Sequence, residues 1–398
     1  MKRLLQRGFL LLLLLAILAG CTPPATPATP DTNIVVLWHP FPGDTGEVLQ
    51  TLGDRFNAEN DAGLTLIVEY QEDAIAKVAA AAPERRPDLV VITSSYEGAN
   101  LAASRVTLPS RDRADLLPMA QSLYAREGML PLGLATYVLY YNYDWLRDLG
   151  YVADAATLSD TMNTACAATD LQGGQIGMGI PSQPMAMLAL MTAGGEGGDH
   201  DATTALHDLL NAGCGQIYET HQQANDQFSE GTLSLLPGSS LWWSAIAQAV
   251  NAEHKFTARA GALPGPEGPG LSLWRGPGLL LLTPEGPRHA ATQQVMEWFL
   301  SPEAQREWSD ATHYLPVRRS LVENRLQDST LDPLAGDLLR LTLQAADEET
   351  WAIWPNHADE PACRAALVRG LLALNDEQFS PDEVLAAIAN ACGAEVSP

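Results

Sequence analysis

The stretch NIVVLWHPFPGDTGEVLQTLGDRFNAEN, residues 33–60, indicates the fold class of this 398-residue chain. Residues 33–38 are mostly β-branched and apolar, as in a buried strand. The turn HPFPGD follows, and Leu49, Leu52 and Phe56 then recur at the spacing that places them on one face of a helix. The stretch therefore predicts a strand, a turn and an amphipathic helix.

The same alternation continues further along the chain. LTLIVEY (64–70) and PDLVVI (87–92) read as strands, with a helix over residues 74–82 between them. Residues 135–150 read as a strand that runs into a helix, which stops at Gly150. Strands that alternate with helices predict an α/β fold with a parallel sheet covered by helices.

The second half of the chain gives weaker signals. Residues 152–258 read mainly as helices with loops. Residues 261–278, GALPGPEGPGLSLWRGPG, are expected to form a loop before the strand GLLLLT, because Gly and Pro interrupt them. Two later helices are expected to begin after Ser301 and Ser380, each of which precedes a proline suited to the first helical position.

The N-terminal segment differs from the rest in composition. Residues 1–20 have a basic start and an apolar run, and they end in Leu-Ala-Gly before Cys21, which resembles a bacterial lipobox. The apolar run is shorter than the about 20 residues that span a bilayer. Residues 21–32 read as an extended Pro/Thr-rich tether. We expect a lipoprotein signal peptide, lipidation of Cys21 and an extracytoplasmic body on the membrane surface; an ordinary cleaved signal peptide is the alternative.

The composition leaves room for two domains of about 150 residues after this segment. The formal net charge is −25, from 48 acidic and 23 basic residues, and basic residues do not cluster beyond short pairs. Nucleic-acid binding is therefore disfavoured, because its affinity comes largely from neutralised phosphates. The same field repels an anionic small ligand unless a local arginine or lysine captures it. We expect a monomer that binds no nucleic acid.

Four cysteines remain besides the one in the lipobox. They are Cys166, Cys214, Cys363 and Cys392. An even number in an exported chain suggests two disulfides with three possible connectivities, and sequence order favours pairing the first two and the last two. Their spacing does not suit a metal site, and we expect no metal and no cofactor.

Four segments, taken in order, resemble the extracellular solute-binding proteins (family 1) that serve ABC importers. They are residues 35–60, residues 137–151 (YVLYYNYDWLRDLGY), residues 228–243 (FSEGTLSLLPGSSLWW) and residues 290–320. The family includes maltose and glycerol-3-phosphate binders, and the first segment is similar in style to the glycerol-phosphate branch. Together the segments span nearly the whole chain beyond the tether.

The resemblance implies two α/β lobes of the type II periplasmic-binding-protein fold, with a hinge that the chain crosses three times. Lobe one would comprise residues 33–133 and 278–318, and lobe two residues 134–277 and 319–398. The ligand would sit between the lobes. The implied partners are an ABC permease and, through it, a cytosolic ATPase.

Hydroxyl and aromatic residues near the expected strand ends are candidate ligand contacts. Hydroxyls suit a polyol, and aromatic rings stack on sugar rings. Trp38 ends the first strand, and Ser95 and Tyr96 follow the third strand. The alternatives are a core tryptophan for Trp38 and a capped turn for the other two.

The resemblance adds candidates in its third and fourth segments. Family members often place ligand contacts at the position of Ser240, Trp242 and Trp243. A Trp-Trp pair in a strand or extended loop points to opposite faces, so at most one should face the cleft. Tyr314, in THYLPV, matches a tyrosine that related polyol-phosphate binders use on the ligand. Packing of that tyrosine against Pro316 in the hinge is the alternative.

Three further candidates lie near the expected hinge and in the C-terminal segment. Gly276, in WRGPG, would let the backbone approach the ligand, with Trp274 nearby. Trp351 and Trp354 fall where the glycerol-phosphate branch carries an arginine for the phosphate, and Trp354 is the ligand contact that we expect there.

The expected charge of the ligand depends on whether an arginine is placed to bind an anion. In that C-terminal segment the chain has no arginine until Arg364, so the resemblance departs at the residue that matters most for an anion. A neutral carbohydrate or polyol is therefore favoured. Arg275 or Arg318 could serve a phosphate, which keeps glycerol-3-phosphate or a glycerophosphodiester as the alternative ligand.

The usual catalytic motifs of hydrolases and nucleotide-binding enzymes are absent from the sequence. It contains no G-x-S-x-G, no H-E-x-x-H and no G-x-x-x-x-G-K-[ST]. A secreted glycoside hydrolase, with paired carboxylates drawn from the 48 acids, is the remote alternative. We expect a binding protein and not an enzyme.

Overall fold

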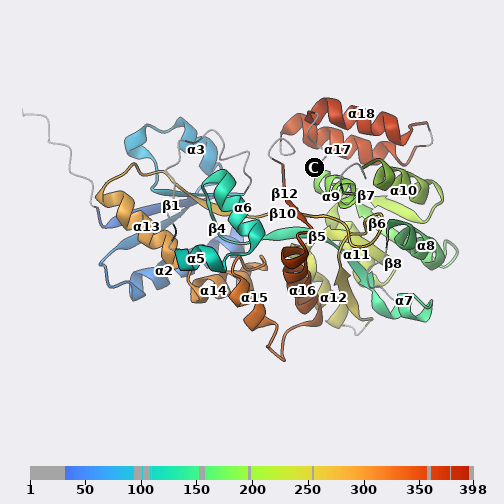
Figure 1. The fold of residues 1–398 in the computed structure, drawn as a ribbon, viewed down its shortest axis with the longest axis horizontal. Helices are drawn as coiled ribbons and strands as arrows, with labels where there is room; N and C mark the ends of the chain where they lie inside the picture. Colours follow the sequence, from blue (N-terminus) through green and yellow to red (C-terminus); the bar gives the residue numbers. More distant parts are fainter. Residues whose placement is uncertain are drawn as a thin grey trace, which may run out of the picture.

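The computed structural model describes residues 32–93, 101, 108, 110–151, 157–195, 199–252, 255–355, 360–376 and 378–393. Within them, two β-sheets covered by helices form two lobes that lie side by side (Figure 1). The predicted two-lobed α/β fold is confirmed. Cys21, Ser95 and Tyr96 lie outside the described residues. Among those described, no helix combines the length and the apolar character needed to cross a membrane.

The first sheet has the strand order β2-β1-β3-β11-β4. Its strands are β1 (Ile34–His39), β2 (Thr65–Tyr70), β3 (Leu89–Ile92), β4 (Leu130–Pro131) and β11 (Gly278–Leu281). β1 runs parallel to β2 and β3, whereas β11 is antiparallel to β3 and β4. The helices of this lobe include α2 (Gly43–Glu59), α3 (Ala74–Ala80), α5 (Ser110–Asp115), α6 (Pro118–Glu127), α13 (Pro287–Phe299) and α14 (Pro302–Thr312).

The strand, turn and helix predicted over residues 33–60 are confirmed by β1 and α2. Leu49, Leu52 and Phe56 are buried on one face of α2, in the same core as Val35 and Leu37 of β1. Burial of large apolar side chains contributes about 1.5–3 kcal/mol each, which is why this face of the helix holds the sheet.

The second sheet has the strand order β12-β10-β5-β8-β6-β7, and β9 also pairs with β5. Its strands are β5 (Ala135–Asn142), β6 (Ile176–Pro181), β7 (Gly215–Tyr218), β8 (Leu233–Ser239), β9 (Ala258–Gly261), β10 (Ser272–Arg275) and β12 (Trp351–Ile353). The helices around it include α7 (Tyr143–Asp148), α8 (Leu158–Ala168), α9 (Pro184–Ala193), α10 (Asp199–Asn211), α11 (His221–Glu230), α12 (Trp243–Ala252), α16 (Pro333–Glu348), α17 (Pro361–Ala373) and α18 (Pro381–Cys392).

Two sequence predictions for this sheet were incomplete. Residues 152–258 contain β6, β7 and β8 besides the expected helices, because Gly and Pro inside IGMGIP and LSLLPGS hide the strand pattern. Residues 261–278, expected to be a loop, contain β10. This short strand is stabilised by partners that are distant in sequence, β5 on one side and β12 on the other.

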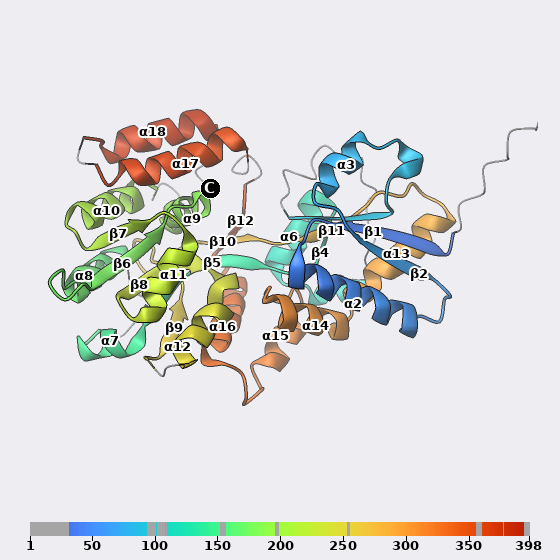
Figure 2. The same ribbon diagram turned by 180° about the vertical axis from the view of Figure 1, so that it is seen from behind.

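The chain passes between the sheets at three places. It crosses from β4 to β5, from β10 to β11, and from α14 through Leu315 to α15 (Arg319–Arg325) and α16. Leu134 and Leu315 exchange two backbone hydrogen bonds of 2.8 Å, so two crossings are tied together. Seen from behind, α14 and α15 lie next to α16 at this junction (Figure 2).

Gly276 is required where two crossings meet. A Cβ at this position would overlap the backbone carbonyl oxygen of Gly133. The space beside the Cα of Gly276 is filled by the neighbouring crossing, and the residue also lines the cavity described below. Its predicted role, a close approach of the backbone to the ligand, stays a prediction.

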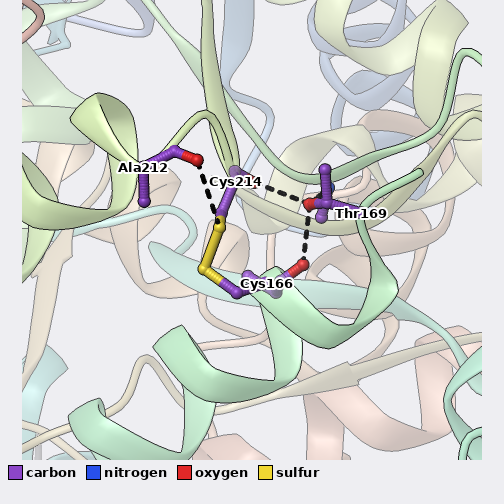
Figure 3. Close-up of a disulfide and its surroundings, with 6 residues drawn as sticks. Cys166, Thr169, Ala212 and Cys214 are labelled. Atoms are coloured by element: carbon purple, nitrogen blue, oxygen red, sulfur yellow. Dashed lines mark hydrogen bonds between the residues drawn. A yellow bond between two sulfur atoms is a disulfide. The ribbon is translucent and has the colours of Figure 1, made fainter. Parts of the chain in front are cut away.

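Both predicted disulfides are confirmed, and both lie in the lobe of the second sheet. Cys166 of α8 pairs with Cys214 before β7, with a Cα–Cα distance of 4.7 Å (Figure 3). Cys363 of α17 pairs with Cys392 of α18 at 4.5 Å. Thr169 reinforces the first link, because its hydroxyl donates to the carbonyl oxygen of Ala165 at 2.9 Å and lies 3.4 Å from that of Cys214.

Candidate ligand-binding site

A cavity of about 60 Å³ lies at the junction of the two sheets. Its lining includes Thr93 after β3, Tyr137 of β5, Met185 of α9, Ser239 of β8, Arg275 of β10, Gly276, Tyr314 and Trp354. Thr93 and Ser239 stand at the carboxyl ends of their strands, the edge where open α/β sheets bind ligands. Three predicted contacts, Gly276, Tyr314 and Trp354, are thus brought together.

Tyr314 lies between the cavity and the core of the first lobe. Its ring stacks on Trp308 with centroids 5.9 Å apart and an interplanar angle of 9°. Ser309 donates to its backbone oxygen at 2.7 Å, which holds the segment after α14. Burial raises the pKa of the Tyr314 hydroxyl, and the positive charge of Arg275 opposes part of that rise. The tyrosine is therefore held by its ring, and its neutral hydroxyl remains available for hydrogen bonding.

Tyr137 begins a polar and aromatic array in the second lobe. Its hydroxyl donates to the side chain of Gln183 at 3.1 Å, and Gln183 is 3.0 Å from His221 Nδ1. Trp242 stacks on His221 at 5.3 Å and meets the edge of Tyr137 at 6.0 Å. Sequence reasoning missed Tyr137, Gln183 and His221. Tyr137 could have been considered from the sequence, because it is the first residue of the second segment that resembles the family.

Trp242 and Trp243 do diverge, but not for the predicted reason. Residues Ser240–Trp242 form a 3-10 turn and α12 begins at Trp243, so the pair is not extended. Trp242 packs with Tyr137 beside the cavity. Trp243 meets the ring of His313 edge-on at 5.2 Å and thereby touches the segment between α14 and the third crossing. Which ring contacts a ligand stays a prediction.

Three other candidates are held in structural contacts. Ser240 is fully buried and its hydroxyl accepts from the backbone N–H of Thr136 at 3.1 Å. Trp274 is 1% exposed in the core. Trp38 donates from Nε1 to Glu69 on β2 at 2.8 Å and lies outside the lining of the cavity. In this arrangement of the lobes, Ser240 and Trp274 offer almost no surface to a ligand.

The two candidate arginines differ in their surroundings. Arg318 is 10% exposed, and its Nε donates to Asp115 of α5 at 2.7 Å. Arg275 lines the cavity, with Nη1 2.8 Å from the sulfur of Met185 and its guanidinium carbon 5.5 Å from the ring centre of Trp354. Arg318 is thus neutralised within the fold, whereas Arg275 faces the junction.

A larger pocket of about 390 Å³ lies elsewhere in the second lobe. Its lining includes residues of β5, β9 and α16, among them Asp337, which accepts two hydrogen bonds from Arg259 at 2.5 and 2.7 Å. Its lining comes from one lobe only. The small cavity at the junction is therefore the better candidate for a site where one ligand contacts both lobes.

Two lobes joined by three crossings, with a cavity at their junction, define a two-lobed solute-binding protein. Residues 51–333 match the family described as bacterial extracellular solute-binding protein, and the chain belongs to this family. The family consists of extracytoplasmic binding proteins. A search of curated protein sequences finds no match.

Solved structures of sugar-binding proteins share the fold. The sugar-binding protein MalE of Xanthomonas citri has a TM-score of 0.75 at 19% identity, covering 90% of this chain and 96% of its own. The cyclic α-maltosyl-1,6-maltose-binding protein of Arthrobacter globiformis has a TM-score of 0.72 at 16% identity, and the match covers 92% of this chain and 99% of that protein. The GacH receptor of Streptomyces glaucescens was solved without ligand and with acarbose. It has a TM-score of 0.67 at 17% identity, and the match covers 90% of this chain and 97% of that protein.

Proposed function

We propose that this protein is the lipid-anchored substrate-binding component of an ABC importer and that it captures a carbohydrate or polyol between its lobes. The observation that carries the proposal is the cavity at the junction, whose lining includes two tyrosines and a tryptophan, Tyr137, Tyr314 and Trp354. The sugar-binding proteins of the same fold support this class of ligand. The sequence favours a neutral ligand, with a glycerol phosphate as the alternative.

The mechanism is closure of the lobes around the ligand. Only a ligand that binds the closed form more tightly than the open form shifts the equilibrium between them. The edge-on contact of Trp243 with His313 joins α12 to the segment that precedes the third crossing, and such contacts would be remade during closure. A dissociation constant on the order of 1 μM corresponds to about −8 kcal/mol, which a few hydrogen bonds and stacked rings supply.

The anchor and the partners complete the proposal. Lipid on Cys21 would keep the receptor at the membrane, the tether would give it reach, and the closed form would dock on the permease. Metabolic labelling with a fatty acid tests the anchor: the wild-type protein should carry label and the Cys21→Ala variant none. Label on both proteins, or on neither, would contradict lipidation at this cysteine.

Calorimetry of the purified protein with monosaccharides, oligosaccharides, polyols and glycerophosphodiesters tests the function. We expect saturable binding of one compound class, with the compound recovered unchanged by chromatography. A bound compound also raises the melting temperature by mass action. Hydrolysis of an added oligosaccharide by the purified protein would favour the glycoside hydrolase and overturn the proposal.

A further inference from the structure

We propose that the guanidinium of Arg275 binds an acidic group of the captured solute, a carboxylate or a phosphate, so that the protein selects an acidic carbohydrate or polyol over its neutral counterpart. The inference rests on the proposed function, because it assigns a ligand group to the same cavity. It replaces the neutral ligand that the sequence favours.

The first argument is that Arg275 has no counterion among the residues that the structure describes. Four other arginines that are at most one-third exposed each pair with an aspartate: Arg259 with Asp337 at 2.5 Å, Arg288 with Asp88 at 2.6 Å, Arg318 with Asp115 at 2.7 Å, and Arg325 with Asp310. Arg275 is half-buried, yet it forms no ion pair with any carboxylate of the described residues. The described lining of the cavity holds no acidic residue, in a chain with 48 acidic residues against 23 basic ones, and this favours an external anion as the partner of Arg275.

The second argument is the surplus of hydrogen-bond donors around the cavity. A guanidinium has five N–H groups, and within the described residues only Nη1 has a side-chain neighbour, the sulfur of Met185, which is a weak acceptor. Trp354 is 5% exposed, and its indole N–H finds no acceptor in the described part of the chain. Donors without acceptors call for a ligand rich in acceptor oxygens.

The third argument is that the guanidinium is already positioned. It lies over the ring of Trp354, 5.5 Å from the ring centre, and its Nη1 is 2.8 Å from the sulfur of Met185 of α9. Within the described residues this leaves Nε and Nη2 without a hydrogen-bond acceptor, and the edge that they form matches the two oxygens of a carboxylate or a phosphate. Tyr314, which lines the same cavity, adds a hydroxyl that donates to the same group or to its neighbour.

The test compares acidic and neutral partners of equal size on the purified full chain. The pairs are D-glucuronate with D-glucose, D-glucose 6-phosphate with D-glucose, and sn-glycerol 3-phosphate with glycerol, each titrated by calorimetry. The variants are Arg275→Gln, which removes the charge, and Arg275→Lys, which keeps the charge but loses the paired N–H groups that bind two oxygens at once. Arg147→Gln is the matched control, because this arginine is 54% exposed on α7 and does not line the cavity.

We expect the wild-type protein and the Arg147→Gln variant to bind the acidic member of at least one pair about 10-fold or more tightly than its neutral member. Arg275→Gln should weaken that binding about 100-fold, which is the effect of losing two charge-assisted hydrogen bonds, and Arg275→Lys should weaken it less. The glucuronate and phosphate arms show whether the group is a carboxylate or a phosphate.

Two outcomes separate the inference from the proposed function. Neutral sugars that bind as tightly as their acidic partners, or an Arg275→Gln variant that keeps its affinity for the acid, would overturn the inference and leave the binding function intact. A folded protein that binds none of these compounds, and none of the oligosaccharides, polyols and glycerophosphodiesters named under the proposed function, would overturn both. The preference of the wild-type protein needs no variant, so the test holds even if Arg275→Gln fails to fold.

Discussion

Replacing Tyr314 with phenylalanine removes one hydroxyl from the lobe junction and leaves the packing in place. The ring would keep its stacking on Trp308 at 5.9 Å. Within the described residues the hydroxyl has no hydrogen-bond partner, so its loss leaves no protein group unsatisfied. We therefore expect the free energy of unfolding of Tyr314→Phe to differ from that of the wild type by less than about 0.5 kcal/mol.

Ligand affinity should change much more than stability. One hydrogen bond from the hydroxyl to a neutral ligand oxygen contributes about 0.5–1.5 kcal/mol, so the dissociation constant should rise about 2- to 13-fold. Tyr314→Ala also removes the stacked ring. Because Tyr314 is only half-buried, the loss of stability should be about 2–3 kcal/mol, below the about 3–5 kcal/mol typical of a fully buried aromatic residue.

Calorimetry with a bound sugar measures the affinity, and unfolding in guanidinium chloride measures the stability. Tyr143→Phe is the matched control, because Tyr143 lies on α7 and does not line the cavity. Wild-type affinity in both Tyr314 variants would refute the placement of the site. A Tyr314→Phe variant destabilised by more than about 1.5 kcal/mol would show instead that the hydroxyl has a structural partner.

Three further predictions concern stability. The link between Cys363 and Cys392 closes a loop of sequence separation 29, so replacing both with serine should cost about 3.6 kcal/mol by the loop-entropy relation, measured by denaturant unfolding; a loss below about 1 kcal/mol would contradict this. Burial lowers the pKa of His313 below its ordinary value of 6.5, so just below pH 6.5 the unfolded state binds more protons than the folded state. The free energy of unfolding should therefore decrease as the pH is lowered through this range. That slope, followed by unfolding at stepped pH, should be smaller in His313→Gln, and equal slopes would exclude this histidine as the cause. Gly276→Ala should lower stability by about 1–3 kcal/mol because its methyl group would overlap Gly133, and an unchanged melting temperature would contradict the packing of the crossings.

Local chemistry made several features predictable from the sequence. The helix after Ser301 begins as expected, because the serine hydroxyl accepts from the N–H of Ala304 and Pro302 occupies the first turn. Ser380 and Glu383 form the complete capping box. The disulfides followed from cysteine order, since each pair closes a segment inside one lobe. Each of these features depends on residues near one another in sequence or on a simple count.

Features that depend on distant partners were not predictable. β10 exists because β5 and β12 lie on either side of it, and no pattern within its own four residues indicates a strand. The role of Gly276 depends on Gly133, which belongs to another crossing. Arg275 and Arg318 look alike in sequence, and only the three-dimensional arrangement gives one an aspartate and leaves the other at the cavity.

The size of the cavity bears on how a ligand enters. About 60 Å³ is well below the about 300–1,000 Å³ of typical small-molecule sites, so a sugar does not fit between the lobes as they stand. The crossings limit how the lobes separate, because Leu134 is bonded to Leu315 and the N–H of Leu132 donates to Pro277 at 2.8 Å. Rotation about these tied strands would widen the cavity while keeping Arg275 and Tyr137 on one side and Thr93 on the other. A ligand that binds Arg275 first would then be positioned for closure, because Thr93 and Tyr314 belong to the lobe that moves toward it.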